Sequence, residues 1–215
     1  MLRLTYAATL AAPLVAGAAM AEPLLYEKAG LYETGLVAGL KAGADFSSPF
    51  NDLGTSPALE VELGWLLPAL ERSLEIFIAG QWAGPTGEGA LPADARLPGD
   101  GIAHWSVDQQ NLRLSLGVLY RIPLEAVVRP YVSLGARTWL LKTTMEGTAG
   151  GEAMGTYTEK STEIGIFGAL GGEWHTGYGA LLLEVQGGYG SYDRTIYEES
   201  AVGTLAVQLG WRFFL

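Results

Sequence analysis

Apolar residues alternate with small or polar residues along most of the chain from Gly35 onward. Such alternation indicates β-strands with two different faces, because successive side chains of a strand point to opposite sides. Clusters of Pro, Gly, Ser and Asp divide the pattern into separate strands of about ten residues, the length that a tilted strand needs to cross the hydrocarbon of a bilayer. The predicted strands are residues 36–46, 59–67, 74–82, 112–122, 132–140, 164–174, 181–189 and 205–215.

Charged residues avoid the apolar face of these strands and lie on the opposite face. The charged residues of that face are Lys41, Asp45, Glu60, Glu62, Glu75, Arg113, Arg121, Arg137, Glu163, Glu173, Glu184 and Arg212. A Lys or Arg placed against lipid at the bilayer midplane costs about 2 to 4 kcal/mol, so a membrane excludes charge from the outer face of a barrel. The pattern predicts an all-β fold, an eight-stranded antiparallel up-and-down transmembrane β-barrel with a lumen closed by a charged network.

A soluble β-sandwich or lipocalin-like barrel also alternates, with its apolar face turned inward. Two features favour the membrane barrel over this alternative. The polar face is rich in glycine, for example Gly117 and Gly135, which suits the narrow inside of a small barrel. Aromatic residues gather at strand ends, as in the two interfacial girdles of membrane barrels. The predicted girdle residues are Trp65, Trp82, Tyr120, Trp174, Tyr189, Trp211 and Phe213, with Phe46 beside the outer ones.

Short and long connections alternate along the chain. The gaps after the second, fourth and sixth strands are short, at residues 68–72, 123–127 and 175–177. Two of the others are long, at residues 83–103 and 143–160, and the first of these predicts a mobile loop because it has no periodicity. Short periplasmic turns and long outer loops are typical of outer-membrane barrels.

Three segments resemble the small eight-stranded outer-membrane barrels of the OmpA and OmpX kind. Residues 129–136 (RPYVSLGA) resemble the Pro-Tyr start of a central strand, and residues 178–190 resemble a glycine-flanked penultimate strand. Residues 209–215 (LGWRFFL) are similar to the C-terminal strand that the barrel-assembly machinery reads, although the chain ends in Leu215 where such proteins usually end in Phe or Trp. The resemblance implies an OmpA/OmpX-like transmembrane barrel in the bacterial outer membrane.

The N-terminus has the order of a secretory signal peptide. Arg3 precedes an uncharged run at residues 4–18, and small residues follow at 19–21. We therefore predict a signal peptide at residues 1–21, cleaved after Ala21, and an outer-membrane barrel domain at residues 22–215. The alternative, a single membrane-spanning helix, is disfavoured because the apolar run is shorter than the roughly 20 residues that a helix needs.

Composition excludes several other classes of function. The chain has no cysteine, so neither a disulfide framework nor a thiolate metal site is possible. It has 13 Lys and Arg against 23 Asp and Glu, a formal net charge of −10, which argues against nucleic acid as a partner. We expect no cofactor.

Few motifs suggest catalysis. His104 and Ser106 share a face near the predicted outer rim, an arrangement also found in outer-membrane lipid A deacylases. Val107 follows the serine where an Asn is usual in that family, and no acidic residue falls on the lipid-facing side of the adjoining stretches. Residues 147–151 lack the Gly-Lys-Ser/Thr of a phosphate loop. The two histidines, His104 and His175, fall on different sides of the predicted membrane and cannot share a metal.

The leading hypothesis is a non-enzymatic barrel with a structural or surface-interaction role. Its expected partners are outer-membrane lipids, the barrel-assembly machinery during insertion, and envelope proteins that meet the outer loops. A lipid A-modifying enzyme and a narrow small-solute channel are the alternatives. An eight-stranded interior has little room for a channel, and mixed charges inside it must pair.

Overall fold

The computed structural model describes residues 35–47, 53–68, 70–91, 93–94, 96–99, 101–124, 126–176, 179–191 and 201–215. The predicted signal peptide, residues 1–21, lies outside the described residues.

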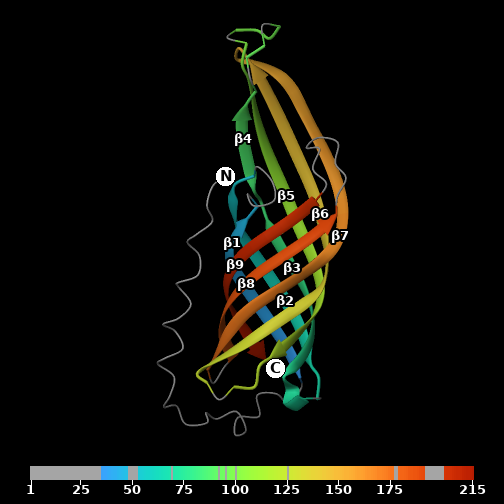
Figure 1. Ribbon diagram of the computed structural model, residues 1–215, viewed down its shortest axis with the longest axis vertical. Coiled ribbons are helices and arrows are strands. Elements are labelled where there is room, and N and C mark those ends of the chain that lie inside the picture. The colour runs from blue at the N-terminus through green and yellow to red at the C-terminus, as the bar shows by residue number, and fades with distance from the viewer. Residues whose placement is uncertain are drawn as a thin grey trace, which may run out of the picture.

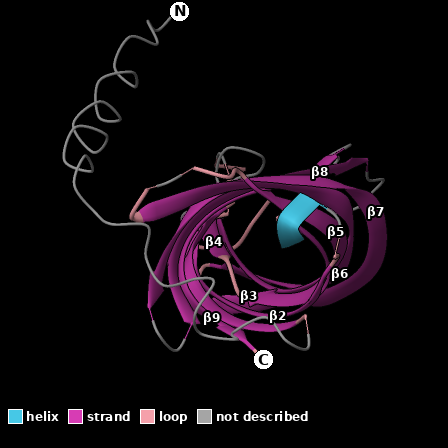
Figure 2. Ribbon diagram, turned by 90° about the horizontal axis from the view of Figure 1, so that it is seen from below, coloured by secondary structure: helices cyan, strands magenta, loops and turns pink. Residues whose placement is uncertain are grey.

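Antiparallel strands make up most of the described structure. They are β1 (Leu36–Phe46), β2 (Thr55–Leu66), β3 (Leu74–Ala83), β4 (Thr86–Ala90), β5 (Ala103–Arg121), β6 (Val128–Ala149), β7 (Glu152–Thr176), β8 (Gly179–Ser191) and β9 (Ala201–Phe214), with a short 3-10 helix η1 (Leu70–Arg72) between β2 and β3. β9 pairs with β1, and β3 pairs with β5, so every strand except β4 belongs to one closed ring of eight (Figure 2). The predicted fold class is confirmed.

The two faces of the ring are inverted relative to a soluble protein. Leu63, Leu116 and Leu209 on three different strands are 48%, 57% and 56% exposed. Charged residues on the opposite face of these strands are fully buried, for example Glu62, which precedes Leu63, and Arg212 of β9. Apolar side chains therefore face outward and charged side chains face the lumen, which excludes the soluble sandwich or lipocalin-like alternative.

The exposed apolar side chains of the ring form a band around it, here called the apolar belt. At one end of the barrel, the strands that form its wall extend well beyond this belt. β5, β6 and β7 continue as a long blade in Figure 1, and β4 pairs with β5 at its edge. The loop predicted at residues 83–103 is therefore right only in part, because it contains β4, while the described residues between β4 and β5 are not in strands. The loop predicted at residues 143–160 is wrong, because this segment is a hairpin of β6 and β7 with one register shift at Gly147 and Thr148.

The strands in these two segments were not predicted because both of their faces are polar. Hydrophobic alternation cannot reveal a strand that leaves the membrane, because neither of its faces is apolar there. The turn itself does follow known rules. Gly150 and Gly151 form a two-residue hairpin loop with positive φ of 57° and 83°, and such paired positive angles are typical of the tight turns that match strand twist.

No helix in the described part of the chain is long and apolar enough to span a bilayer.

Candidate functional site

The lumen holds a network of ion pairs in which Arg212 of β9 is central. Its Nε donates to Glu62 Oε1 of β2 at 2.6 Å, and its Nη2 donates to Oε2 at 3.0 Å. Its Nη1 donates to Glu173 Oε1 of β7 at 2.5 Å. The guanidinium carbon also lies 4.6 Å from the ring centroid of Tyr131, within cation-π range. This one side chain therefore joins β9 to β2 and β7, neither of which is its neighbour in the ring.

Arg121 of β5 extends the network towards the end with the short turns. Its Nε donates to Glu173 Oε2 at 2.8 Å, and its Nη2 donates to Glu75 Oε2 of β3 at 2.7 Å. Glu173 thus accepts hydrogen bonds from two arginines that lie on opposite walls. Both carboxylates are fully buried, so these charge-assisted bonds compensate for lost hydration.

Lys41 of β1 extends the network from Glu62, which it shares with Arg212, to two further carboxylates. Its Nζ lies 2.8 Å from Glu60 Oε1, 2.8 Å from Glu62 Oε2 and 3.0 Å from Glu184 Oε1. An ammonium group has three donors, so three carboxylates saturate it. Glu62 is shared between Lys41 and Arg212, which makes the cluster continuous across the lumen.

Arg137 of β6 joins the cluster through a neutral side chain. Its Nη2 donates to Gln186 Oε1 at 2.8 Å, and Gln186 Nε2 donates to Glu60 Oε2 at 2.8 Å. Its Nε donates to Ser115 Oγ at 2.8 Å, and its guanidinium carbon lies 4.4 Å from the ring centroid of Phe167. The amide of Gln186 thus relays the charge interaction between an arginine and a carboxylate.

Arg113, which lies nearer than Arg121 to the blade end of β5, forms a separate ion pair with Asp45 of β1. It donates to both carboxylate oxygens of Asp45, at 2.9 and 2.7 Å, and to Gln81 Oε1 at 2.7 Å. The neutral members Gln81, Gln186 and Tyr131 are not among the predicted network residues, because the charge pattern of the sequence does not distinguish them. Their position in the strand pattern was a usable signal, because each shares the lumen-facing parity of its charged neighbours.

Glu163 stands apart from this network. It has the lumen-facing parity and pairs in register with Trp139, but it is only half-buried and forms no ion pair with the residues that the structure describes. The reason is its height in the wall. The described part of β8 pairs with β7 only from Gly165 onward, so Glu163 lies beyond the edge of the closed ring.

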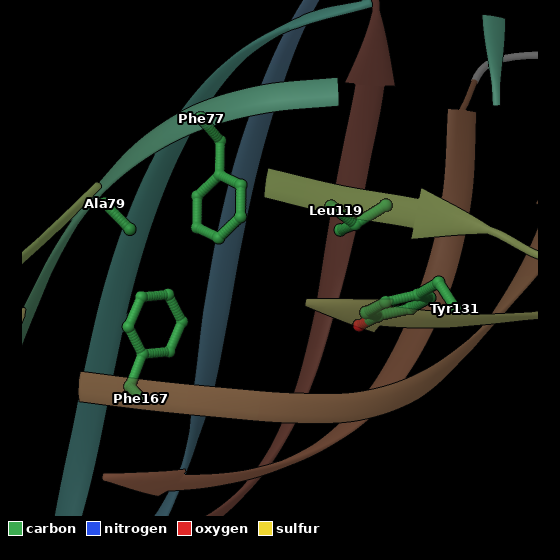
Figure 3. Close-up of a cluster of buried hydrophobic side chains, with 5 residues drawn as sticks. All are labelled: Phe77, Ala79, Leu119, Tyr131 and Phe167. Atoms are coloured by element: carbon green, nitrogen blue, oxygen red, sulfur yellow. The ribbon is translucent and has the colours of Figure 1, made fainter. Parts of the chain in front are cut away.

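Aromatic rings fill the lumen beside the charges. A buried cluster contains Phe77, Ala79, Leu119, Tyr131 and Phe167. Figure 3 shows Phe77 and Phe167 pointing towards each other from opposite strands, with ring centroids 6.0 Å apart and planes at 80°. This edge-to-face arrangement is a favoured aromatic geometry. The lumen is therefore a packed interior.

Apolar clusters also lie at each end of the charged network. The cluster at the end with the short turns contains Val37, Leu66, Ala180 and Phe214, and the cluster towards the long hairpin contains Trp139, Leu141 and Val202. The indole of Trp139 is fully buried. Both ends of the charged network are therefore flanked by buried apolar side chains.

Lumen glycines make room for the large side chains. A Cβ on Gly171 would overlap the phenol ring of Tyr131, and a Cβ on Gly117 would lie 2.9 Å from Phe77 Cζ. Gly187 on the outward face of β8 differs, because nothing lies within 4 Å of its Cβ position. The glycine-rich polar face is therefore explained at these positions by packing.

We expect Gly171→Val to lower the free energy of unfolding by about 1 to 3 kcal/mol, because overpacking forces Tyr131 out of its position. Gly187→Val is the matched control and should be neutral or slightly stabilising, since valine favours strands and meets open space. Urea titration of the folded protein in lipid vesicles, read by tryptophan fluorescence, measures both. Equal effects of the two substitutions would contradict the packing explanation.

The predicted girdle residues lie on the outward face near the ends of the ring. Trp65, Trp82, Trp174, Tyr189 and Phe213 are exposed, and Tyr120 and Trp211 are half-buried. In the register, Trp174, Leu181 and Trp211 form one row across three strands at the end with the short turns. Trp82 pairs with Leu112 at the other end of the belt.

His104 and Ser106 are exposed on the outward face of β5, within the extended blade. The expectation that no acidic residue adjoins them is wrong. Glu88 of β4 and Glu146 of β6 are the register partners of Ser106 on its two sides. Both glutamates fall in segments expected to be loops, so the sequence pattern could not place them. A groove of about 650 Å³ runs beside these residues.

The described residues contain no group of three or more His, Cys, Asp or Glu side chains arranged to hold a metal ion. His175 lies at the opposite end of the ring from His104 and stacks on Phe214, with ring centroids 5.4 Å apart.

Comparisons with known proteins bear on the fold. No family model matches the chain, and no curated protein matches it. Among solved structures, Neisserial surface protein A has a TM-score of 0.53 at 17% identity, with 84% of this chain and 96% of that chain covered. A major outer membrane protein from Thermus thermophilus gives 0.47 at 18% identity, covering 83% and 99%. The N-terminal β-barrel domain of Pseudomonas aeruginosa OprF gives 0.43 at 14% identity, covering 84% and 98%.

At 17% identity the likeness to Neisserial surface protein A concerns the fold alone, and it agrees with the ring order and the inverted faces described above. The chain therefore has the fold of the small eight-stranded outer-membrane β-barrels.

Proposed function

We propose that this protein is an integral barrel of the bacterial outer membrane with a structural or surface-interaction role and a lumen closed to solutes. The observation that carries the proposal is the inversion of the two faces. Exposed leucine, isoleucine and valine surround the whole ring, while the ionic side chains lie inside it. A continuous exposed apolar surface of this kind is stable only against lipid.

The contacts inside the ring support a closed lumen. Arg212, Lys41 and Arg121 bridge non-adjacent walls, so their side chains cross the space that a solute would need. Apolar clusters at both ends add a second obstruction. A barrel of eight strands has an interior just wide enough for side chains to fill.

The blade formed by β4 to β7 suits a surface-interaction role. It extends beyond the apolar belt on the side away from the short turns, where partners in the envelope are accessible (Figure 1). Export through a signal peptide at residues 1–21 and insertion by the barrel-assembly machinery complete the proposal. Trp211 and Phe213 lie on the outward face of β9, which suits recognition of that strand during assembly.

Catalysis on lipid is not favoured by the position of His104 and Ser106. Leu112 is the outermost apolar residue on the outward face of β5, and Ser106 lies six positions farther along the strand. At about 3.3 Å per residue, the serine is roughly 20 Å along the strand from the belt. A lipid acyl ester near the hydrocarbon boundary is out of its reach.

Conductance tests the closed lumen. We expect flat single-channel recordings when the purified protein is inserted into planar bilayers, because charged side chains cross the lumen at several heights. A porin recorded under the same conditions is the positive control. Heat-modifiable mobility on SDS gels, measured on the same preparation, establishes that the barrel is folded. Reproducible conductance steps from folded protein would overturn the closed lumen and favour the channel.

A further inference from the structure

Two lysines lie directly opposite each other on the outward face of the wall. Lys142 of β6 and Lys160 of β7 are register partners, and both are exposed. On its other side Lys142 pairs with Gln110 of β5, which is neutral. Like charges directly opposite one another destabilise a sheet. An anion bound between the two ammonium groups would remove this repulsion.

The described residues do not supply that counter-charge. Neither ammonium lies within ion-pair distance of a carboxylate among them. On the same face, Asp108 pairs with Thr144 in the next row outward, and Glu146 lies one row beyond that. In the next row outward, hydroxyl groups lie directly beyond the lysines on β6 and β7. Thr144 and Thr158 lie within hydrogen-bond distance of each other on the outer side, at 3.4 Å between their Oγ1 atoms.

The height of the pair places it at the edge of the apolar belt. In the row directly inward, Leu140 pairs with Leu112 on one side and with Thr162 on the other. Leu112 also pairs with Trp82, the outer girdle tryptophan. One further row inward, Ile164 is 71% exposed. The lysines therefore form the first charged row beyond the hydrocarbon, and their long stems can reach the level of lipid headgroups.

We propose that Lys142 and Lys160 together bind the phosphate monoester headgroup of a membrane lipid in the leaflet on the side of the long β6–β7 hairpin. A phosphate monoester carries a charge of about −1.5 to −2 at neutral pH, which matches two ammonium groups, whereas a phosphodiester carries only one negative charge. The acyl chains of this lipid lie against Leu140 and Ile164 below the lysines. The inference deepens the proposed function and rests on its membrane location.

Lipid binding to the purified barrel in detergent, resolved by native mass spectrometry, tests this proposal. The probes are phosphatidic acid, which has a phosphate monoester, and phosphatidylglycerol of the same acyl chains, which has a diester. We expect phosphatidic acid to bind at least about tenfold more tightly. K142Q/K160Q should weaken its binding roughly 10- to 30-fold, since each basic residue near a lipid surface contributes about a factor of three to five.

R72Q/R96Q is the matched control. It removes the same amount of charge from residues away from this face and should leave phosphatidic acid binding unchanged. K142R/K160R should retain binding. Without lipid, K142Q/K160Q should unfold at the same or a slightly higher urea concentration, because it removes a repulsion. A loss of binding would then not reflect misfolding.

Three outcomes would overturn the inference: equal binding of the two lipids, unchanged binding in K142Q/K160Q, or full competition by glycerol 3-phosphate. The last would indicate a site for a soluble phosphate. Flotation of the protein with phosphatidylcholine vesicles separates this test from the proposed function. Failure to insert would overturn the membrane location, whereas insertion without lipid discrimination would overturn only the lysine site.

Discussion

Replacing Arg212 by methionine should lower the free energy of unfolding by about 3 to 5 kcal/mol, the cost of leaving a buried ion without its partner. The guanidinium is fully buried and binds Glu62 and Glu173. Without it, Glu62 keeps only Lys41 and Glu173 keeps only Arg121 as a cationic partner at hydrogen-bond distance among the described arginines and lysines. The buried network has six carboxylates against five cations, so the loss of Arg212 adds one further uncompensated negative charge to the lumen. Urea titration in lipid vesicles, followed by gel mobility without heating, measures the change.

Two further variants identify the cause of that loss. Arg72→Met removes an arginine from the short helix η1 outside the lumen network and should change stability by less than about 0.5 kcal/mol. R212M/E62Q removes a cation and an anion together and should be more stable than R212M alone, because the net charge of the network returns to its wild-type value. If R212M unfolds at the wild-type urea concentration, the network does not stabilise the barrel.

Leu116→Arg should destabilise the folded barrel in lipid by about 2 to 4 kcal/mol, since Leu116 lies midway along the apolar outward face of β5. His104→Arg is the matched control on the same face of the same strand. It lies in the blade beyond the belt, where an added charge costs roughly 0 to 1 kcal/mol. The same vesicle unfolding assay compares the two variants.

This comparison tests the orientation on which the proposed function depends. A barrel in water would tolerate an arginine at Leu116, because the side chain is already 57% exposed. Equal unfolding of the two variants in vesicles would therefore count against a lipid-facing belt. A clear difference between them, with Leu116→Arg the less stable, would support it.

The network and the belt have complementary roles in one structure. The apolar belt provides the affinity for lipid. The ion-pair network connects strands that are not paired with each other through their backbones. Arg212 contacts strands two positions away in the ring on both sides. Because the backbone ladder of a closed barrel already satisfies its own hydrogen bonds, the side chains inside it are free to pair with one another.

The period-two pattern was sufficient to predict the ring and its orientation. Leu63, Leu116 and Leu209 were expected to face lipid, and the structure exposes all three. The eight predicted strands all fall within or largely overlap the observed ones. The prediction was correct because the outer face of a membrane barrel must be apolar throughout, so every second residue of each strand is constrained to be apolar or small.

The pattern failed where that constraint ends. Residues 83–103 and 143–160 were expected to be loops, although they contain β4 and the ends of β5 to β7. Strands in water can be polar on both faces and are held by backbone pairing, which leaves little trace in hydrophobicity. For the same reason Glu88 and Glu146 could not be placed beside Ser106.

By itself, the sequence determined which side chains face the lumen, because parity along a strand is a local property. Only the tertiary structure decided which of them meet, such as Arg212 with Glu62 and Glu173 from β2 and β7, and which lysines stand opposite each other on the outer face, Lys142 and Lys160. Those contacts depend on strand register and on the closure of β9 against β1, which relate residues far apart in the chain. No local pattern carries that information, since many registers preserve the same alternation.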